Sequence, residues 1–323
     1  MYPMKLIAPL KDYIWGGTKL KTEYGKKTEL DKVSESWELA CHKDGMSVIA
    51  NGSASGDTLE SYLEKNTAAL GSRAEKFPYF PLLIKLIDAK DNLSVQVHPD
   101  NDYAMRVEGE FGKTEMWYIV EAEPDASLIY GFKHEISADE FARRIADNTL
   151  LEVCNKVPVK KGDVFFIASG TLHAIGKGII IAEIQQNSNT TYRVYDYGRV
   201  GKDGKPRELH VAKAKEVTSL TRPTRDTKAL AKVPVADYDM ELLAACEYFT
   251  VYHAAVKNGS CKLTTDEGSF QSITVLAGKF DLIAANASEE NNITLAKGGT
   301  VFLPANLGVY ELNGTGEFIL SEV

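Results

Sequence analysis

Hydrophobic and polar residues alternate along much of this chain in short segments, a spacing typical of β-strands with one buried face. In residues 92–100 the apolar side chains at positions 93, 95 and 97 point one way, and Ser94, Gln96 and His98 point the other way. Pro99 cannot donate to a sheet, so we expect the strand to stop just after the imidazole. Gln96 and His98 then share the end of one strand face.

Other segments are also typical of strands, either by such alternation or, at residues 82–88, by a near-continuous apolar run. We predict strands at residues 82–88, 112–120, 161–170, 171–176, 179–186 and 191–197, and more short strands after residue 247. Three short helices are predicted at residues 57–65, with Asp57 as N-cap, at residues 137–148, which open with a capping box and an Ile136/Phe141 staple, and at residues 210–217. The chain is therefore expected to be mainly β, with a few short helices.

A weak internal repeat relates residues 160–175 to residues 297–312 without gaps. In this register His173 falls opposite Tyr310. We therefore expect two β-barrel domains of shared architecture, of which the second has lost a metal ligand. The chemistry then belongs to the first domain.

The length of 323 residues, of which 44% are hydrophobic, allows one large core or two smaller ones. A polar, proline-bearing connector near residues 221–240 marks the expected boundary. We divide the chain into residues 1–235, a metal-binding catalytic domain with helical insertions, and residues 236–323, a degenerate copy.

The charge pattern restricts the partners. The net charge is −8, the acidic residues are dispersed and no basic stripe is present, which argues against nucleic acid and against an anionic membrane. The chain also has no run of about 18 apolar residues and no signal-peptide pattern, so we expect a soluble cytoplasmic protein. Four widely spaced cysteines without a CxxC pair indicate reduced thiols rather than disulfides or a thiolate zinc site: Cys41, Cys154, Cys246 and Cys261.

Potential metal ligands lie on three of the predicted strand segments. They are Gln96, His98, Glu115 and His173. Two histidines, one carboxylate and a neutral oxygen donor suit a divalent transition ion that keeps about one positive charge and acts as a Lewis acid. A lone histidine is more often an ordinary strand residue, so the prediction depends on the whole set. The ligand types alone leave zinc, iron and manganese open.

Two cationic side chains accompany these ligands. Lys113 lies on the same face as Glu115, and Arg193 lies on the strand at residues 191–197. The guanidinium suits a phosphate or a developing oxyanion, and a lysine can lose its proton when it is desolvated near a cation. The combination fits proton abstraction next to a carbonyl, with the ion and Arg193 stabilising an enediolate. The alternative for Arg193 is a simple salt bridge with Glu183.

Lys85 and Trp15 each leave two structural interpretations open. Lys85 interrupts the apolar run at residues 82–88 and is either paired in the interior or extended towards solvent at an edge. Trp15, beside two glycines, is either core or a pocket wall. The sequence has no GxGxxG between a strand and a helix, no Walker-type loop and no serine nucleophile elbow, which disfavours nicotinamide chemistry and nucleotide hydrolysis.

At these positions the chain resembles the short bacterial form of type I mannose-6-phosphate isomerase, a family of zinc enzymes in the cupin superfamily. The resemblance rests, in chain order, on Trp15-Gly-Gly17, Gln96-Val-His-Pro99, Gly112-Lys-Thr-Glu-Met116, Gly170-Thr-Leu-His-Ala174 and the segment from Glu183 to Arg193. It covers nearly the whole chain. It implies two cupin-type jelly-roll β-barrel domains and one Zn²⁺ per chain, held by Gln96, His98, Glu115 and His173.

The resemblance also implies the interconversion of mannose 6-phosphate and fructose 6-phosphate through a cis-enediol, with one base moving a proton between C2 and C1. It assigns Arg193 to the active site and Lys113 to a place beside the metal. Lys113 is our first candidate for the base, and a metal-bound water is the second. The expected substrate-binding residues are Trp15, Lys85, Glu183 and Asn189. Longer members carry an aspartate at the position of Asn189, so an acid–base role does not transfer there.

Two other functions stay open from the sequence. A non-enzymatic sugar-binding cupin would use the pocket for sensing, but it has no reason to keep Lys113 beside the ligands. An iron-dependent cupin oxygenase would need iron and oxygen. For the isomerase we expect a small-molecule sugar phosphate as partner, no nucleic acid and no membrane, and a monomer or weak homo-oligomer.

Overall fold

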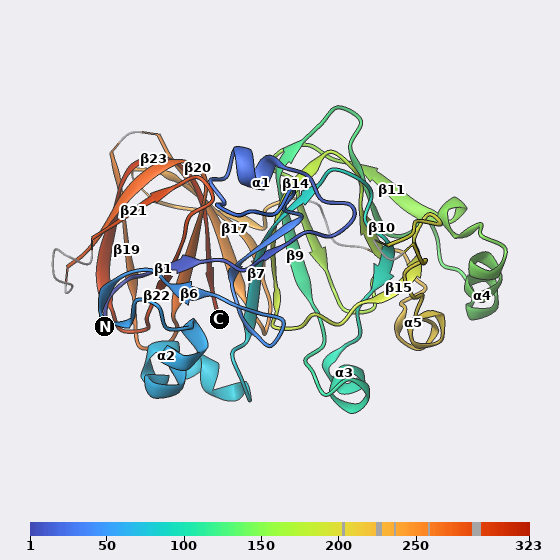
Figure 1. The fold of residues 1–323 in the computed structure, drawn as a ribbon, viewed down its shortest axis with the longest axis horizontal. Helices are drawn as coiled ribbons and strands as arrows, with labels where there is room; N and C mark the ends of the chain where they lie inside the picture. Colours follow the sequence, from blue (N-terminus) through green and yellow to red (C-terminus); the bar gives the residue numbers. More distant parts are fainter. Residues whose placement is uncertain (202–203, 224–227, 236, 258, 286–291) are drawn as a thin grey trace.

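The structure is a computed structural model that describes residues 1–201, 204–223, 228–235, 237–257, 259–285 and 292–323. Strands dominate it and the helices are few and short, which confirms the mainly β class (Figure 1). Among the described residues no sheet closes on itself, so the barrels expected from the sequence do not form as closed sheets. All strand pairs described below are antiparallel.

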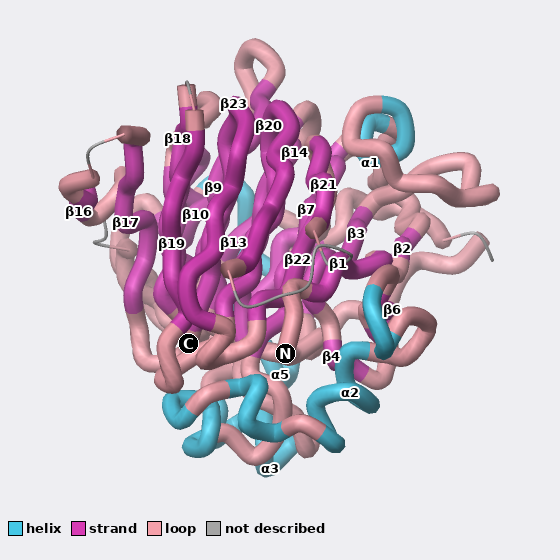
Figure 2. The backbone as a smooth tube through the Cα atoms, turned by 90° about the vertical axis from the view of Figure 1, so that its left-hand side faces the viewer, coloured by secondary structure: helices cyan, strands magenta, loops and turns pink. Residues whose placement is uncertain are grey.

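Within the described residues, the largest sheet has ten strands. Its order is β16 (Ala231–Val233), β17 (Asp239–Ala245), β18 (Thr250–Val256), β23 (Gly308–Glu322), β20 (Gln271–Ala284), β22 (Thr300–Leu303), β1 (Met4–Ile7) and β6 (Val48–Ile49), while β19 (Ser260–Thr265) pairs with β23 and β21 (Ile293–Ala296) pairs with β20. Figure 2 shows the long strands β20 and β23 side by side. The first strand of the chain thus completes a sheet built from its last third.

Two smaller sheets hold the site residues predicted from the sequence. The six-stranded sheet has the order β12 (Val164–Ile167), β9 (Glu115–Ala122), β14 (Ile179–Gln186), β7 (Leu82–Ala89), β3 (Glu35–Leu39) and β2 (Leu10–Lys11). The five-stranded sheet has the order β11 (Cys154–Pro158), β10 (Ser127–Phe132), β13 (His173–Ile175), β8 (Val95–Val97) and β15 (Tyr192–Tyr195). A short pair, β4 (Cys41–His42) and β5 (Gly45–Met46), lies apart from both.

Apolar clusters pack against the faces of these sheets. One lies between the six-stranded and the five-stranded sheets and includes Trp117, Ile181 and Ile175. A second lies between the six-stranded and the ten-stranded sheets and includes Ile84 and Phe302. A third covers the outer face of the five-stranded sheet. Strands β7, β9 and β14 are therefore buried on both faces, as their continuous apolar runs predict.

The helices lie at the edges of the sheets. They are α1 (Lys19–Thr22), α2 (Leu59–Lys65), α3 (Asn101–Val107), α4 (Ala138–Ala146) and α5 (Val211–Val217), with 3₁₀ turns η1 (Gly52–Ala54), η2 (Thr67–Leu70), η3 (Ser72–Lys76) and η4 (Leu150–Glu152). In Figure 1 α4 and α5 lie together beyond the five-stranded sheet. The Ser137 side chain accepts a hydrogen bond from the Glu140 amide at 3.1 Å, which confirms the predicted cap of α4. No helix in the described ranges is long and apolar enough to cross a membrane.

Two local predictions are wrong by a residue or two. Leu93 precedes β8 and packs in the cluster of Trp117, whereas Val95 and Val97 pack in the cluster on the outer face, so the alternation begins only with β8. The N-cap of α2 is Thr58 rather than Asp57, because the residue with extended backbone (φ −70°, ψ 149°) directly before the helix is Thr58.

The predicted repeat and the domain boundary stay predictions. Each half of the repeat forms two successive strands. These are β12 and β13 in residues 160–175, and β22 and the start of β23 in residues 297–312. Tyr310 is buried and donates from its hydroxyl to Gln271 Oε1 at 2.6 Å. Of the proposed connector, residues 224–227 and residue 236 lie outside the described residues, and β16, just before residue 236, already pairs with β17.

The cap of α2 yields a direct test. The Thr58 side chain accepts from the Ser61 amide at 3.2 Å, while the Asp57 side chain is exposed. We expect Thr58→Ala to lower by about 1 kcal/mol the free energy that protects the amides of α2 from hydrogen exchange, because an N–H loses its acceptor. Asp57→Ala, the control, is expected to change it by no more than about 0.5 kcal/mol. A larger effect at Asp57 would contradict the assignment.

Candidate active site

Three potential metal ligands meet where three strands begin or end. His98 follows β8 directly, Glu115 is the first residue of β9 and His173 is the first residue of β13. All three are buried, and each offers a ligand atom within 4.8 Å of the other two. The structure therefore brings together the histidines and the carboxylate that the sequence pattern selected, from strands of both smaller sheets.

Backbone carbonyls orient the two imidazoles. Nδ1 of His98 lies 2.8 Å from the carbonyl oxygen of Thr190, and Nδ1 of His173 lies 2.8 Å from that of Thr171. Because a carbonyl can only accept, each Nδ1 carries the proton and each Nε2 presents a lone pair. The two Nε2 atoms are 3.1 Å apart, so two lone pairs converge on one point.

Neither imidazole carries a second proton on its Nε2 atom. Burial and the nearby ammonium of Lys113 lower the pKa of His173 to about 3 and hold the pKa of His98 well below its usual range. Both rings are therefore neutral at physiological pH. Neutral imidazoles with converging Nε2 atoms are the form that binds a transition metal.

Glu115 supplies the anion of this cluster. Its Oε1 lies 3.4 Å from Nε2 of His173 and 3.8 Å from Nε2 of His98, and it is buried with no hydrogen-bond donor from any described residue. Its Oε2 accepts from the Lys113 ammonium. Burial, and then the charge of Glu183, raise the pKa of Glu115 to about 8. A buried carboxylate oxygen without a donor is unfavourable unless a cation binds it, so these residues fit a divalent ion.

Gln96 lies beside this cluster. It is the cross-strand partner of His173, and its side-chain nitrogen lies 3.4 Å from His173 Nε2. Its Oε1 accepts from the Ser94 hydroxyl at 3.4 Å. A half-turn of the amide would present the oxygen to the cluster instead, and the two amide orientations are interchangeable in shape. Gln96 is therefore placed to be a fourth ligand.

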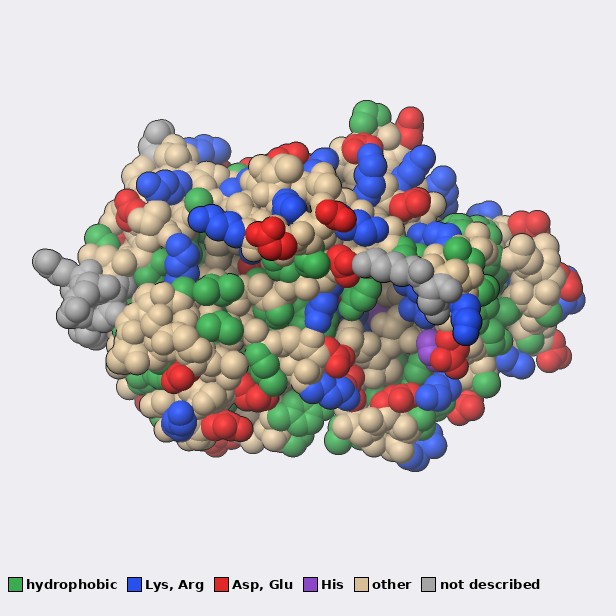
Figure 3. All heavy atoms as spheres, in the orientation of Figure 1, with side chains coloured by type: hydrophobic (Ala, Val, Ile, Leu, Met, Phe, Trp, Pro, Cys, Tyr) green, Lys and Arg blue, Asp and Glu red, His purple; other side chains and the backbone are tan. Residues whose placement is uncertain are grey.

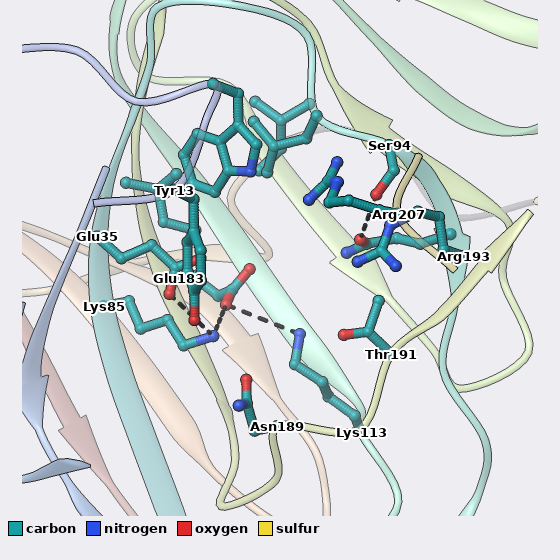
Figure 4. Close-up of a pocket in the computed structure, with 15 residues that line it drawn as sticks. Tyr13, Glu35, Lys85, Ser94, Lys113, Glu183, Asn189, Thr191, Arg193 and Arg207 are labelled. Carbon is teal, nitrogen blue, oxygen red and sulfur yellow. Dashed lines mark hydrogen bonds and ion pairs between the residues drawn. The ribbon is translucent and has the colours of Figure 1, made fainter. Parts of the chain in front are cut away.

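A row of alternating charges leads away from Glu115 across the six-stranded sheet. Lys113 Nζ lies 3.7 Å from Glu183 Oε1, and Lys85 Nζ lies 3.1 Å from the same oxygen. Lys85 is in turn 3.9 Å from Glu35. Figure 4 shows the two ammonium groups on either side of the Glu183 carboxylate. Lys85 is 4% exposed, so it is a paired interior lysine rather than one that extends towards solvent.

The charge row fixes the ionisation of its members. Burial opposes the charge on Glu183, but Lys113 and Lys85 lower its pKa to about 2. Trp117 Nε1 also donates to Glu183 Oε2 at 2.8 Å. Burial opposes the charge on Lys85 as well, and Glu183 followed by Glu35 raises its pKa above the usual value. Glu183 and Lys85 thus form a fixed ion pair beside the potential metal ligands.

A cavity of about 260 Å³ opens above this row. Its lining residues are Tyr13, Trp15, Glu35, Lys85, Ile87, Leu93, Ser94, Gln96, Lys113, Ile175, Glu183, Asn189, Thr191, Arg193 and Arg207. Figure 3 shows the surface hollowed over the half of the molecule that holds β9 and β15, with acidic and basic side chains interspersed around it. Trp15 is both core and wall, because it is 4% exposed and lines the cavity.

Arginines gather at the end of the cavity opposite Glu183 (Figure 4). Arg193 donates from Nη1 to the backbone oxygen of Glu208 at 2.8 Å, while its Nε is buried and has no hydrogen-bond partner among the described residues. Glu183 therefore does not form the salt bridge with Arg193 that the sequence left open; it pairs with lysines instead. Arg207, on the same side, is held by Asp196 at 2.6 and 2.8 Å.

Asn189 lines the wall between the two ends, and its amide donates to Asp44 Oδ2 at 2.8 Å. The lining residues that the sequence analysis did not select include Tyr13, Glu35 and Arg207. Glu35 could have been found, because an interior Lys85 requires anionic partners on a neighbouring strand. Arg207 gives no such signal, because it reaches the cavity only through the return of the chain after β15.

Comparison with known proteins agrees with this geometry. Residues 4–125 match a model of the type I phosphomannose isomerase catalytic domain, and residues 239–323 match a model of the mannose-6-phosphate isomerase cupin domain. The chain is 37% identical to mannose-6-phosphate isomerase of Streptococcus mutans over 319 residues, which are 99% of this chain and 98% of that protein. The chain belongs to the type I mannose-6-phosphate isomerase family.

Other members of the family support the fold and the length. A probable mannose-6-phosphate isomerase of Bacillus subtilis, GmuF, is 38% identical over 99% of both chains. The crystal structure of mannose 6-phosphate isomerase from Bacillus subtilis has a TM-score of 0.92 and 34% identity, and the match covers 100% of both chains. The apo form of the Salmonella typhimurium enzyme shares the fold, with a TM-score of 0.78 at 16% identity and 99% coverage of both chains. The resemblance found in the sequence is confirmed.

The ligand geometry predicts an order of effects on metal content. We expect His98→Ala and His173→Ala to abolish bound metal, because each removes a buried lone pair from the cluster. Gln96→Ala is expected to retain part of it, since an amide oxygen is the weakest of the four donors. Metal content of the purified variants, measured by elemental analysis, checks the order. If Gln96→Ala were the most damaging of the three, the ranking of the ligands would be wrong.

Proposed function

We propose that this protein is a zinc-dependent aldose–ketose isomerase that interconverts mannose 6-phosphate and fructose 6-phosphate through a cis-enediol. The observation that carries the proposal is the buried His98, Glu115 and His173 cluster, which adjoins Lys113 at the floor of a cavity with arginines at its far end. Family membership supports mannose 6-phosphate as the substrate, and zinc is the ion that the sequence resemblance implies. The family members named above are isomerases, which disfavours the sensing and oxygenase alternatives.

The two ends of the cavity suit the two ends of the substrate. A protein of net charge −8 needs local cations to bind a dianionic sugar phosphate, and the arginine end supplies them. Within the part of the chain that the structure describes, the Nε of Arg193 is buried without a partner, and Ser94 and Thr191 add hydroxyls to the same lining. We assign the phosphate to this end. Glu183, Lys85 and Asn189 then face the sugar hydroxyls, with Trp15 as an apolar wall.

The cluster would hold zinc through Gln96, His98, Glu115 and His173. When bound, the ion supplies positive charge that stabilises the oxygens of the enediol, as a Lewis acid does. This role needs an ion that is reached from the cavity, and Gln96 and Lys113 line the cavity directly in front of the buried ligands.

Lys113 is our candidate for the base. Its Nζ lies 3.1 Å from His98 Nε2 and also contacts Glu115, so two of its partners are potential metal ligands. A cation held by these ligands repels the ammonium and favours the neutral amine. The neutral amine takes the proton from C2 of the aldose and delivers it to C1, and the reverse reaction runs through the same group.

The remaining parts of the proposal concern organisation. We propose two jelly-roll cupin domains, residues 1–235 with the metal site and residues 236–323 without one. The match of residues 239–323 to a cupin domain model supports the second unit. We further propose a cytoplasmic protein that is a monomer or a weak homo-oligomer.

The proposed reaction has a direct test. We expect the purified protein to convert mannose 6-phosphate to fructose 6-phosphate in a coupled assay, and we expect a chelator to abolish turnover and added zinc to restore it, because the ion stabilises the enediol. Circular dichroism before and after chelation serves as the control for folding. Full turnover by protein shown to be free of metal would refute the metal-dependent mechanism.

The role of Lys113 is tested by isotope exchange. We expect Lys113→Met to remain folded, because methionine keeps the stem and volume, and to suppress both turnover and the transfer of solvent deuterium into product in heavy water. Lys65→Met, at an exposed lysine of α2, is the matched control and is expected to behave as the wild type. Near-normal exchange in Lys113→Met would give the role of base to another group.

A further inference from the structure

The Glu110 carboxylate does not line the cavity, but it binds the segment that forms one wall of the cavity. Glu110 lies in the loop between α3 and β9, three residues before Lys113. Its Oε2 accepts from three groups of the segment 188–190: the Ser188 hydroxyl at 3.3 Å, the Asn189 amide at 3.1 Å and the Thr190 hydroxyl at 3.0 Å. Its Oε1 accepts from His42 Nε2 at 3.2 Å and Lys43 Nζ at 3.0 Å.

The segment that Glu110 holds is part of the site. Asn189 lines the cavity, and the backbone oxygen of Thr190 accepts from Nδ1 of His98 at 2.8 Å. That hydrogen bond sets the tautomer of His98 and the direction in which Nε2 points. The side chain of Thr190, which fixes the position of this carbonyl, is bound to Glu110. Glu110 is thus two contacts removed from a potential metal ligand.

The contacts of Glu110 require an acceptor at both oxygens. The Asn189 backbone N–H can only donate to Oε2. His42 Nδ1 accepts from the Asp44 amide at 3.1 Å, so its Nε2 carries the proton and donates to Oε1. These donors, His42 first, hold the pKa of Glu110 well below its usual range. Glutamine is nearly isosteric but has one acceptor and one donor group, so in either orientation its NH₂ faces a donor.

We propose that Glu110 is a positioning residue, which orients His98 for metal binding through Thr190 and holds the cavity wall at Asn189. The proposal rests on the proposed function in one respect, namely that His98 binds the ion. The same loop carries Lys113, whose backbone amide donates to the Pro99 oxygen at 3.0 Å. Glu110 therefore ties the loop that carries the candidate base to the cavity wall at Asn189.

The test is the zinc affinity of Glu110→Gln, measured on metal-free protein by competition with a chromophoric chelator. We expect the dissociation constant to rise about 10- to 100-fold, the usual consequence of losing a group that orients a metal ligand. Lys43→Met is the matched control, because it removes a contact to the same carboxylate from a side chain that is 72% exposed. It is expected to leave zinc affinity within about twofold of the wild type.

A second pair of variants covers the case in which Glu110→Gln fails to fold. Thr190→Val removes the hydroxyl but keeps the carbonyl that binds His98, and Thr190→Ser keeps both. We expect Thr190→Val to weaken zinc binding and Thr190→Ser to restore it. A role in stability alone would lower the melting temperature of Glu110→Gln and leave the zinc dissociation constant of the folded protein unchanged, and that result would overturn the proposal, as would unchanged affinity in Thr190→Val.

These measurements separate the two proposals. If the wild type binds zinc but does not isomerise mannose 6-phosphate, the proposed function fails while the zinc affinities still decide the role of Glu110. If the wild type is an active zinc isomerase and Glu110→Gln and Thr190→Val bind zinc as it does, only the role of Glu110 fails.

Discussion

The need to pair buried charges is the constraint on which the rest of this structure depends. Glu115, Lys113, Glu183 and Lys85 are each less than 5% exposed, and every carboxylate among them lies beside an ammonium. Removing one partner of such a pair leaves an uncompensated buried charge, which costs about 3–5 kcal/mol. The pairing also fixes strand register, because Lys85 lies directly across from Glu183. A slip of one residue would turn every side chain of β7 to the opposite face.

Strands β7, β9 and β14 pack against a different sheet on each of their two faces. On one face, Ile84 of β7, Met116 of β9 and Ile184 of β14 join the apolar cluster that also contains Phe249, Phe270 and Phe302 of the last third of the chain. On the other face the charged residues of these strands meet the five-stranded sheet. The ten-stranded sheet thus supplies the apolar support behind the site without lining the cavity. This arrangement explains how a lysine can stand in the near-continuous apolar run of residues 82–89.

Local pattern predicted the parts of this structure that depend on neighbours in sequence. Alternation located β8, apolar runs located β7, β9 and β14, and the capping box located α4, because each of these signals lies within a few residues. Glu115 was selected because a carboxylate on an otherwise apolar face needs a cation, and the structure places it beside Lys113 and the two histidines. Sequence did not reveal Glu35 or Arg207, whose contacts with the site depend on which strands become neighbours. It also placed the cap of α2 one residue early, because aspartate and threonine are nearly equal as caps.

The balance of charge connects the buried row to the metal and to the substrate. When Glu115 is ionised, Lys113 is protonated and the imidazoles are neutral, the three carboxylates Glu35, Glu183 and Glu115 and the two ammonium groups Lys85 and Lys113 give this row one net negative charge. A divalent ion held by the histidines and Glu115 would keep Glu115 ionised and add two positive charges to the row. The floor of the cavity would then attract developing negative charge on the sugar oxygens, while the arginines at the other end attract the phosphate. A site that is slightly anionic before it binds the ion thereby favours first the cation and then the anionic substrate, in an order set by charge alone.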